Sequence, residues 1–136
     1  MEQHGLPLSI QIDGANRHDV KLLAQTLDAI VVARPPEDAT TLQHLCADAG
    51  YSGQPAKAQI EERHYIPHVR SRGEERQAKQ EGKQARRWVV EVTHSWLNRF
   101  RKLLVRFEKK ACNYEALLHF ACALIIWRKL IPIHAR

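Results

Sequence analysis

The stretch TLQHLCADAGYSG, residues 41–53, joins a short apolar run to a turn flanked by glycines. The run from Thr41 to Ala47 predicts a short buried strand, and Gly50 and Gly53 mark the turn that follows it. Asp48 comes where the strand ends. Ligands of α/β proteins bind outside the carboxyl ends of strands, so this carboxylate is a candidate functional group. The commoner alternative is a turn-forming aspartate that accepts hydrogen bonds from its own backbone.

The segments on either side of this strand predict an α/β fold. Apolar residues alternate from Leu6 to Ile12, which is typical of a strand, and Pro7 places that strand at a sheet edge. Helical spacing follows His18, with Asp19 in the first turn. A helix over Gln54–Arg63 and a brief strand over residues 65–69 come next. This alternation predicts a mostly parallel sheet with covering helices.

The C-terminal half is predicted to be helical. Residues 71–83 are polar and form either an exposed loop or a frayed helix start. One long amphipathic helix is predicted over Ala85–Lys110. The next helix, Tyr114–Lys129, is apolar almost all round, so it is expected to be buried and to end at Pro132. The polar face of the long helix carries Arg87, Glu91, His94, Asn98, Arg101 and Lys102.

The charge of the chain is distributed unevenly. The 136 residues, one small domain in length, carry 21 basic and 15 acidic side chains, a net charge of +6. Residues 1–69 have a net charge of −4, whereas residues 70–110 have a net charge of +8. Aromatic residues lie within this basic block, which favours a polyanion as partner. A solvated basic helix face is the alternative.

Several classes of protein are disfavoured. The longest apolar run has eight residues, Phe120–Trp127, whereas a membrane-spanning helix needs about 20. The first residues show no secretory signal, and the three cysteines form no C-x-x-C pair. A cytoplasmic protein with unpaired thiols is therefore expected. Serine-nucleophile, P-loop and dinucleotide motifs are absent from the sequence.

Glu91 is the second candidate acid. A lone acid among basic residues is more often a salt-bridge partner, but it can also be a metal ligand within a phosphate-binding surface. Together with Asp48 it fits two-metal phosphodiester chemistry, which usually needs a third acidic ligand. The pairs His64 with His68 and His119 with Cys122 are weaker candidates; the latter is more readily a satisfied core pair than a zinc site.

Three segments resemble DDE transposases of bacterial insertion sequences. Residues 86–104, RRWVVEVTHSWLNRFRKLL, resemble the catalytic helix of that family. Residues 45–51, LCADAGY, resemble the strand that carries its second aspartate. Residues 14–19, GANRHD, match the turn and helix start before that strand. The resemblance covers nearly the whole chain, in the family's order.

The resemblance implies a partial RNase H-like fold, with 1–136 as the C-terminal part of the catalytic domain. It implies an enzyme that nicks DNA at the ends of a mobile element and joins the freed 3′-ends to target DNA. Asp48 and Glu91 would be the second and third catalytic acids and ligands of Mg2+ or Mn2+. Residues expected at DNA are Arg87, Asn98, Arg99, Arg101 and Lys102.

The sequence departs from the family pattern in two respects. In the motif Y-x2-R-x3-E-x6-K, Arg87 and Glu91 match, but Gln84 and Asn98 replace the tyrosine and the lysine. The family's first aspartate has no counterpart. Asp13 would lie about 14 Å from Asp48, given strands about 4.8 Å apart in the family's sheet order. We therefore expect a truncated chain with an open strand edge, marginally stable or self-associating.

Three functions follow from these expectations. The chain is part of an active transposase, completed by a separate N-terminal segment. Alternatively, it is an inactive remnant that binds DNA or forms homo-oligomers and interferes with the full-length enzyme. The third is an RNase H-like nuclease unrelated to transposition. DNA is the expected partner in each case, and no membrane is expected.

Overall fold

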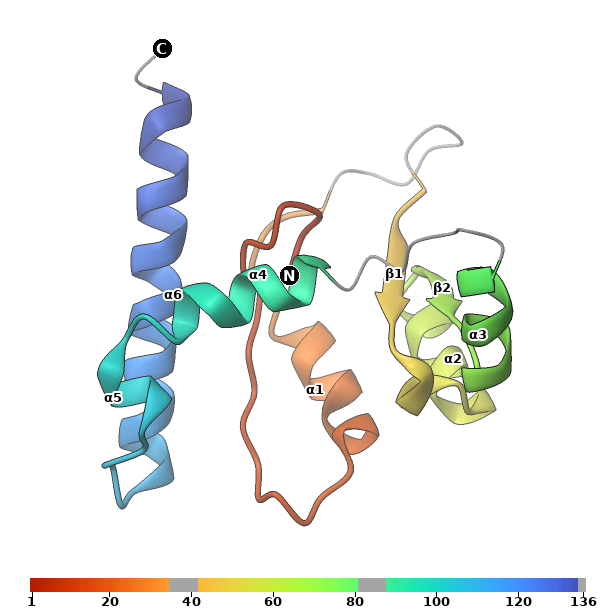
Figure 1. The fold of residues 1–136 in the computed structure, drawn as a ribbon, viewed down its shortest axis with the longest axis horizontal. Helices are drawn as coiled ribbons and strands as arrows, with labels where there is room; N and C mark the ends of the chain where they lie inside the picture. The colour runs from red at the N-terminus through yellow and green to blue at the C-terminus, as the bar shows by residue number, and fades with distance from the viewer. Residues whose placement is uncertain (35–41, 81–87, 135–136) are drawn as a thin grey trace. The chain divides into compact units, whose positions relative to one another are not determined.

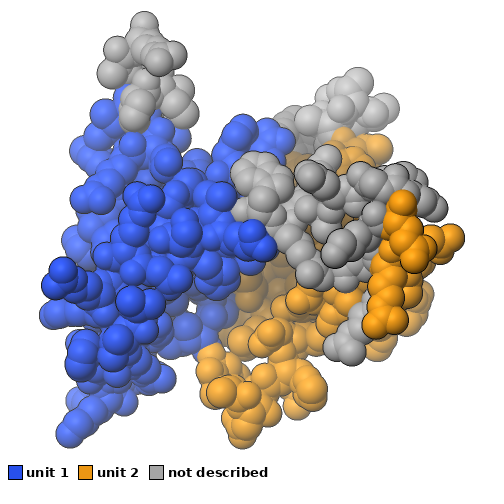
Figure 2. All heavy atoms as spheres, in the orientation of Figure 1, with its two compact units in different colours: residues 1–12, 87–136 blue, residues 13–86 orange. Residues whose placement is uncertain are grey.

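The structure, a computed structural model, describes residues 1–34, 42–80 and 88–134. It is mixed α/β, as predicted. The chain divides into two compact units, shown in Figure 2. Unit 1 comprises Met1–Ile12 and Arg87–Arg136, and unit 2 comprises Asp13–Arg86. Each unit has its own hydrophobic core.

Unit 2 confirms the predicted order of helices and strands around Asp48 (Figure 1). The helix expected after His18 begins with a 3-10 turn, and the polar stretch after residue 71 is helical. In chain order the elements are η1 Asp19–Leu22, α1 Leu23–Asp28, β1 His44–Ala47, η2 Ala49–Tyr51, α2 Gln54–Glu62, β2 Ile66–Val69 and α3 Arg72–Gln80.

Strands β1 and β2 pair in parallel, which confirms the predicted parallel sheet. Leu45, Ala47 and Val69 face the core formed with α1 and α2, where Ile60 is completely buried. The other face of β1 is exposed, so the prediction of a buried strand holds for only one of its faces. Residues along a strand alternate between faces, and among the described residues only one face is packed in the core.

Two arginines hold the end of α2 in place. The Arg63 guanidinium donates to both carboxylate oxygens of Asp28, at 2.6 and 2.9 Å, and so joins α2 to the end of α1. Arg34 donates to the carbonyl oxygens of Arg63 and His64 and stacks over the Tyr65 ring. These contacts stabilise the tight connection to β2, in which His64 has a φ of 59°.

Unit 1 contains the C-terminal helices and the first twelve residues. Its helices are α4 Trp88–Leu97, α5 Arg101–Leu104 and α6 Ala111–His134. Helices α4 and α5 both contact α6. The buried core comprises Leu97, Leu103, Leu118, Ala121, Cys122 and Ile125.

The single helix predicted over Ala85–Lys110 is wrong, because the chain breaks between α4 and α5. Phe100, at the break, has an extended backbone conformation. In a straight helix, Leu97 and Leu103 would point about 120° apart, at 100° per residue. The break lets both leucines pack in the same core against α6. Burial of two leucines thus outweighs the few helical hydrogen bonds that are lost.

The strand predicted over Leu6–Ile12 is also wrong, since residues 6–12 belong to neither strand of the described sheet. Ile10 and Ile12 instead pack against the core of unit 1. The alternation of apolar residues therefore reflects contact with a core on one side. It did not indicate pairing with another strand.

Helix α6 differs from its prediction in burial and in length. Phe120 is 63% exposed and Trp127 is 66% exposed, so the expectation of a buried helix is wrong. The core residues of α6 occupy one side, facing α4 and α5. The helix also continues past Pro132 to His134, the last residue that the structure describes, although proline has no N–H for a helical hydrogen bond. Among the described helices, none has the length and apolarity required to cross a bilayer.

Candidate functional site

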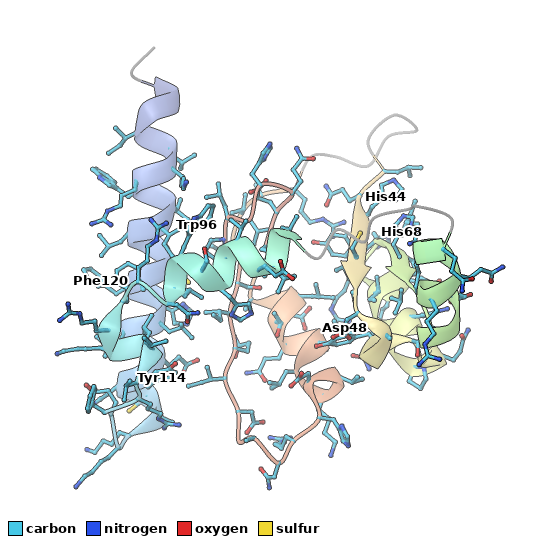
Figure 3. All side chains as sticks on the ribbon, viewed as in Figure 1. His44, Asp48, His68, Trp96, Tyr114 and Phe120 are labelled. Atoms are coloured by element: carbon cyan, nitrogen blue, oxygen red, sulfur yellow. The ribbon has the colours of Figure 1, made fainter. Side chains whose placement is uncertain are left out.

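Asp48 lies directly after β1, at the carboxyl end of the strand, as predicted (Figure 3). Its Oδ1 atom accepts a hydrogen bond from the Gly50 N–H at 2.8 Å and caps η2. A Cβ at Gly50 would lie 3.0 Å from this oxygen, so glycine permits the close turn. The turn-forming role is therefore confirmed. It employs one carboxylate oxygen of an exposed residue, which is compatible with a ligand role for the other.

Tyr51 shows how Asp48 affects its surroundings. Partial burial raises the pKa of the Tyr51 hydroxyl, and the negative charges of Asp19 and Asp48 raise it further. A phenol that resists ionisation adds no negative charge beside the carboxylates. Tyr51 therefore lies close enough to Asp19 and Asp48 for their charges to act on its hydroxyl.

Glu91 lies in the first turn of α4, where its side chain is exposed. Thr93, two residues further on, is buried and bonded to the N-terminal segment. The helix is thus anchored through Thr93 while Glu91 is presented to solvent.

The residues expected to contact DNA lie in different parts of unit 1. Asn98 and Arg99 follow α4, and Arg101 and Lys102 belong to α5; all four are exposed. The continuous polar face predicted for residues 87–102 is therefore wrong beyond Leu97. Arg87 lies outside the described residues. These four side chains are close together in the chain, and three of them are cationic, so they could bind phosphate groups.

The two candidate acids belong to different units, Asp48 to unit 2 and Glu91 to unit 1. Both are exposed carboxylates, the ligand type that Mg2+ prefers. Within residues 1–34, 42–80 and 88–134, no group of three or more potential metal ligands occurs. Each acid fits a hard divalent cation, and the described part of the chain does not assemble a complete set of ligands.

The contacts of the histidines differ from those that their spacing in the sequence suggested. His119 is exposed and lies 4.0 Å from Glu115, so it does not form a core pair with the buried Cys122. His68 instead meets His44, with Nδ1 of His44 2.6 Å from Nε2 of His68. The sequence does not reveal this pair, since the contact depends on the register of β1 and β2. Both strands were predicted, but their register was not.

Comparison with known proteins decides the family. The family model described as a transposase DDE domain matches residues 1–126. The chain belongs to the DDE transposase family. A transposase assigned to insertion sequence element IS402 of Burkholderia cepacia is 36% identical over 132 residues. This alignment covers 95% of the chain. The resemblance to insertion-sequence transposases is therefore confirmed.

The same alignment shows how much of the relative's length this chain covers. This DDE transposase chain spans 61% of the length of the Burkholderia relative. No solved structure matches the chain. The family assignment thus rests on sequence, and the structure adds the placement of individual residues within each unit.

Proposed function

We propose that this chain serves metal-dependent DNA strand cleavage and strand transfer in the transposition of an insertion sequence. Membership of the DDE family carries the proposal. The position of Asp48 at the carboxyl end of β1 supports it, since ligands bind at that end of strands in α/β sheets. The α/β architecture is compatible with the C-terminal part of an RNase H-like catalytic domain, which we include in the proposal.

In this proposal Asp48 and Glu91 are metal ligands. A bound Mg2+ or Mn2+ would activate the attacking oxygen and stabilise the leaving oxygen of a phosphodiester. Asp48 is held by the Gly50 N–H, which fixes one carboxylate oxygen and orients the other. Glu91 is held on α4, whose anchor is the buried Thr93. A further acidic ligand is required to complete the site.

The basic residues bind the DNA backbone in this proposal. Arg99, Arg101 and Lys102 would contact phosphates, with Asn98 donating a hydrogen bond and Arg87 adding a further cation. Such contacts position DNA without reading its sequence. They use four of the thirteen basic residues between positions 70 and 110.

A second function is favoured by the same charge. The chain binds DNA without cleaving it, alone or as a homo-oligomer, and competes with a full-length transposase. Binding of this kind falls steeply with salt and shows little sequence preference. Affinity for one DNA sequence that persists at moderate salt would contradict this alternative.

The decisive experiment completes the chain with an N-terminal segment that supplies the further acid, and compares Asp48→Asn and Glu91→Gln with wild type on DNA carrying the element ends. Asparagine at 48 retains an oxygen for the Gly50 N–H, and both changes remove only the charge. Strand cleavage should be lost while DNA binding is retained. Glu61→Gln, an exposed acid on α2, is the matched control and should cleave normally.

Two other outcomes separate the functions. Cleavage retained in either acid variant would overturn the assignment of that residue. DNA binding by the completed wild-type protein with no cleavage under Mg2+ or Mn2+ would favour the non-catalytic alternative. Hydrolysis without strand joining would instead indicate a nuclease.

A further inference from the structure

The exposed face of the sheet in unit 2 carries an uncommon pair of residues. In the ladder, His44 lies opposite Ile66, and Cys46 lies opposite His68. Side chains alternate between faces, so these four positions share one face. The opposite face packs in the core through Leu45, Ala47 and Val69. His44 and His68 are exposed diagonal neighbours on adjacent strands, labelled in Figure 3.

The two imidazole rings meet through their nitrogen atoms. Nδ1 of His44 lies 2.6 Å from Nε2 of His68, and the ring centroids are 4.8 Å apart with a tilt of 39°. Two ring nitrogens at this distance would repel each other if each presented only a lone pair. One of them must donate a proton to the other, or both must share a cation.

We propose that His44 and His68 form a binding site for a late first-row divalent metal ion such as Ni2+, Zn2+ or Cu2+. Nδ1 of His44 and Nε2 of His68 are the ligand atoms. Neutral imidazole is a preferred ligand of these ions, whereas Mg2+ and Ca2+ prefer oxygen. Two ligands on rigid, paired strands are positioned before the metal arrives, which lowers the cost of binding.

Metal binding requires the two facing nitrogens to separate from 2.6 Å to about 3 Å, since each lies about 2.0–2.1 Å from a bound ion. Small rotations of the two exposed side chains supply this separation. The proton between the rings moves to the second nitrogen of its own ring, so both facing nitrogens present lone pairs and the charge of the neutral pair is unchanged. No third ligand group accompanies the pair among the described residues, so water completes the coordination at this exposed face.

This site is separate from Asp48, the candidate acid in the same unit. His44 and Asp48 are four residues apart along β1, about 13 Å at 3.3 Å per residue. The ligand atoms also differ, being nitrogen in one case and carboxylate oxygen in the other. Mg2+ in excess should therefore not displace Ni2+ from the histidine pair.

Calorimetric titration of the full chain with NiCl2 tests the proposal. Wild type is compared with His44→Gln and His68→Gln, while His94→Gln, an exposed position on α4, is the matched control. Loss of even an outer-shell partner typically weakens metal affinity about 10- to 100-fold, so removal of either ligand should weaken it at least tenfold. The control should bind as wild type does.

Thermal unfolding with and without Ni2+ provides a second measurement, checked by circular dichroism for retained folding. A ligand that binds the folded state raises the midpoint temperature, so Ni2+ should raise it in wild type and His94→Gln but not in the two pair variants. Cys46→Ser should retain binding, since both imidazoles remain. Equal Ni2+ affinity in wild type and both pair variants, or loss of binding in Cys46→Ser alone, would overturn the two-histidine site.

Discussion

The Thr93 hydroxyl donates a hydrogen bond to the carbonyl oxygen of Gly5 at 2.5 Å, joining residues 88 positions apart in the chain. Thr93 is buried on α4, and Gly5 has a φ of +87°. A Cβ at Gly5 would lie 3.3 Å from the Thr93 hydroxyl oxygen and 3.3 Å from a methyl carbon of Val92. Close approach of the N-terminal segment to the helix that carries Glu91 therefore depends on glycine.

Gly5→Ala should destabilise the chain by about 1–2 kcal/mol, because an L-residue is strained at positive φ and the added methyl group is crowded. Chemical unfolding followed by circular dichroism measures the change. Gly73→Ala is the control: it lies within α3 with no atom close to the new Cβ, and it should be neutral or slightly stabilising. Equal effects of the two substitutions would contradict the role of Gly5.

Ile60→Ala should destabilise unit 2 by about 2–5 kcal/mol, because it leaves a cavity in the core. Ile60 is 0% exposed and lies beside Leu23 and Val69. Val31→Ala, at a side chain that is 91% exposed, should change the free energy of unfolding by less than about 0.5 kcal/mol. Urea unfolding of the two variants provides the comparison. A loss at Ile60 no larger than that at Val31 would mean that this core does not form.

Asp28→Asn should make the stability of the chain less dependent on acid pH. The hydrogen bonds from Arg63 lower the pKa of the Asp28 carboxyl in the folded state. Because this pKa is lower in the folded than in the unfolded chain, the ionised carboxylate stabilises the fold at pH values above the unfolded pKa of about 3.9. The stabilisation is lost as the pH falls through the folded pKa. Wild type should therefore exceed the variant in stability at pH 6 and match it at strongly acid pH. A difference that persists unchanged in acid would contradict this ion pair.

The three cysteines should react with a thiol reagent at different rates. Cys46 and Cys112 are exposed, whereas Cys122 is 7% exposed, and burial raises the pKa of its thiol. The thiolate is the reactive form, so Cys122 should react only slowly in the native protein. Spectrophotometric titration at mildly alkaline pH should show two fast thiols, with the third released by denaturant. Three equally fast thiols would mean that the core of α6 is open.

Sequence patterns predicted unit 2 better than unit 1. The strand before Asp48, the helix from Gln54 and the strand ending at Val69 were all confirmed. Each of these depends on local signals, namely a short apolar run, glycine turns and helical spacing. The family, too, followed from contiguous motifs around Asp48 and Glu91, because such motifs are preserved in the order of residues.

The sequence by itself determined the family, the two candidate acids and the basic charge of residues 70–110. Tertiary structure decided the break after Leu97, the exposure of Phe120 and Trp127 on α6, and the contact between His44 and His68. The physical reason is that periodicity shows which residues favour burial or one face of an element. It does not specify the partner, which depends on contacts between residues far apart in the chain.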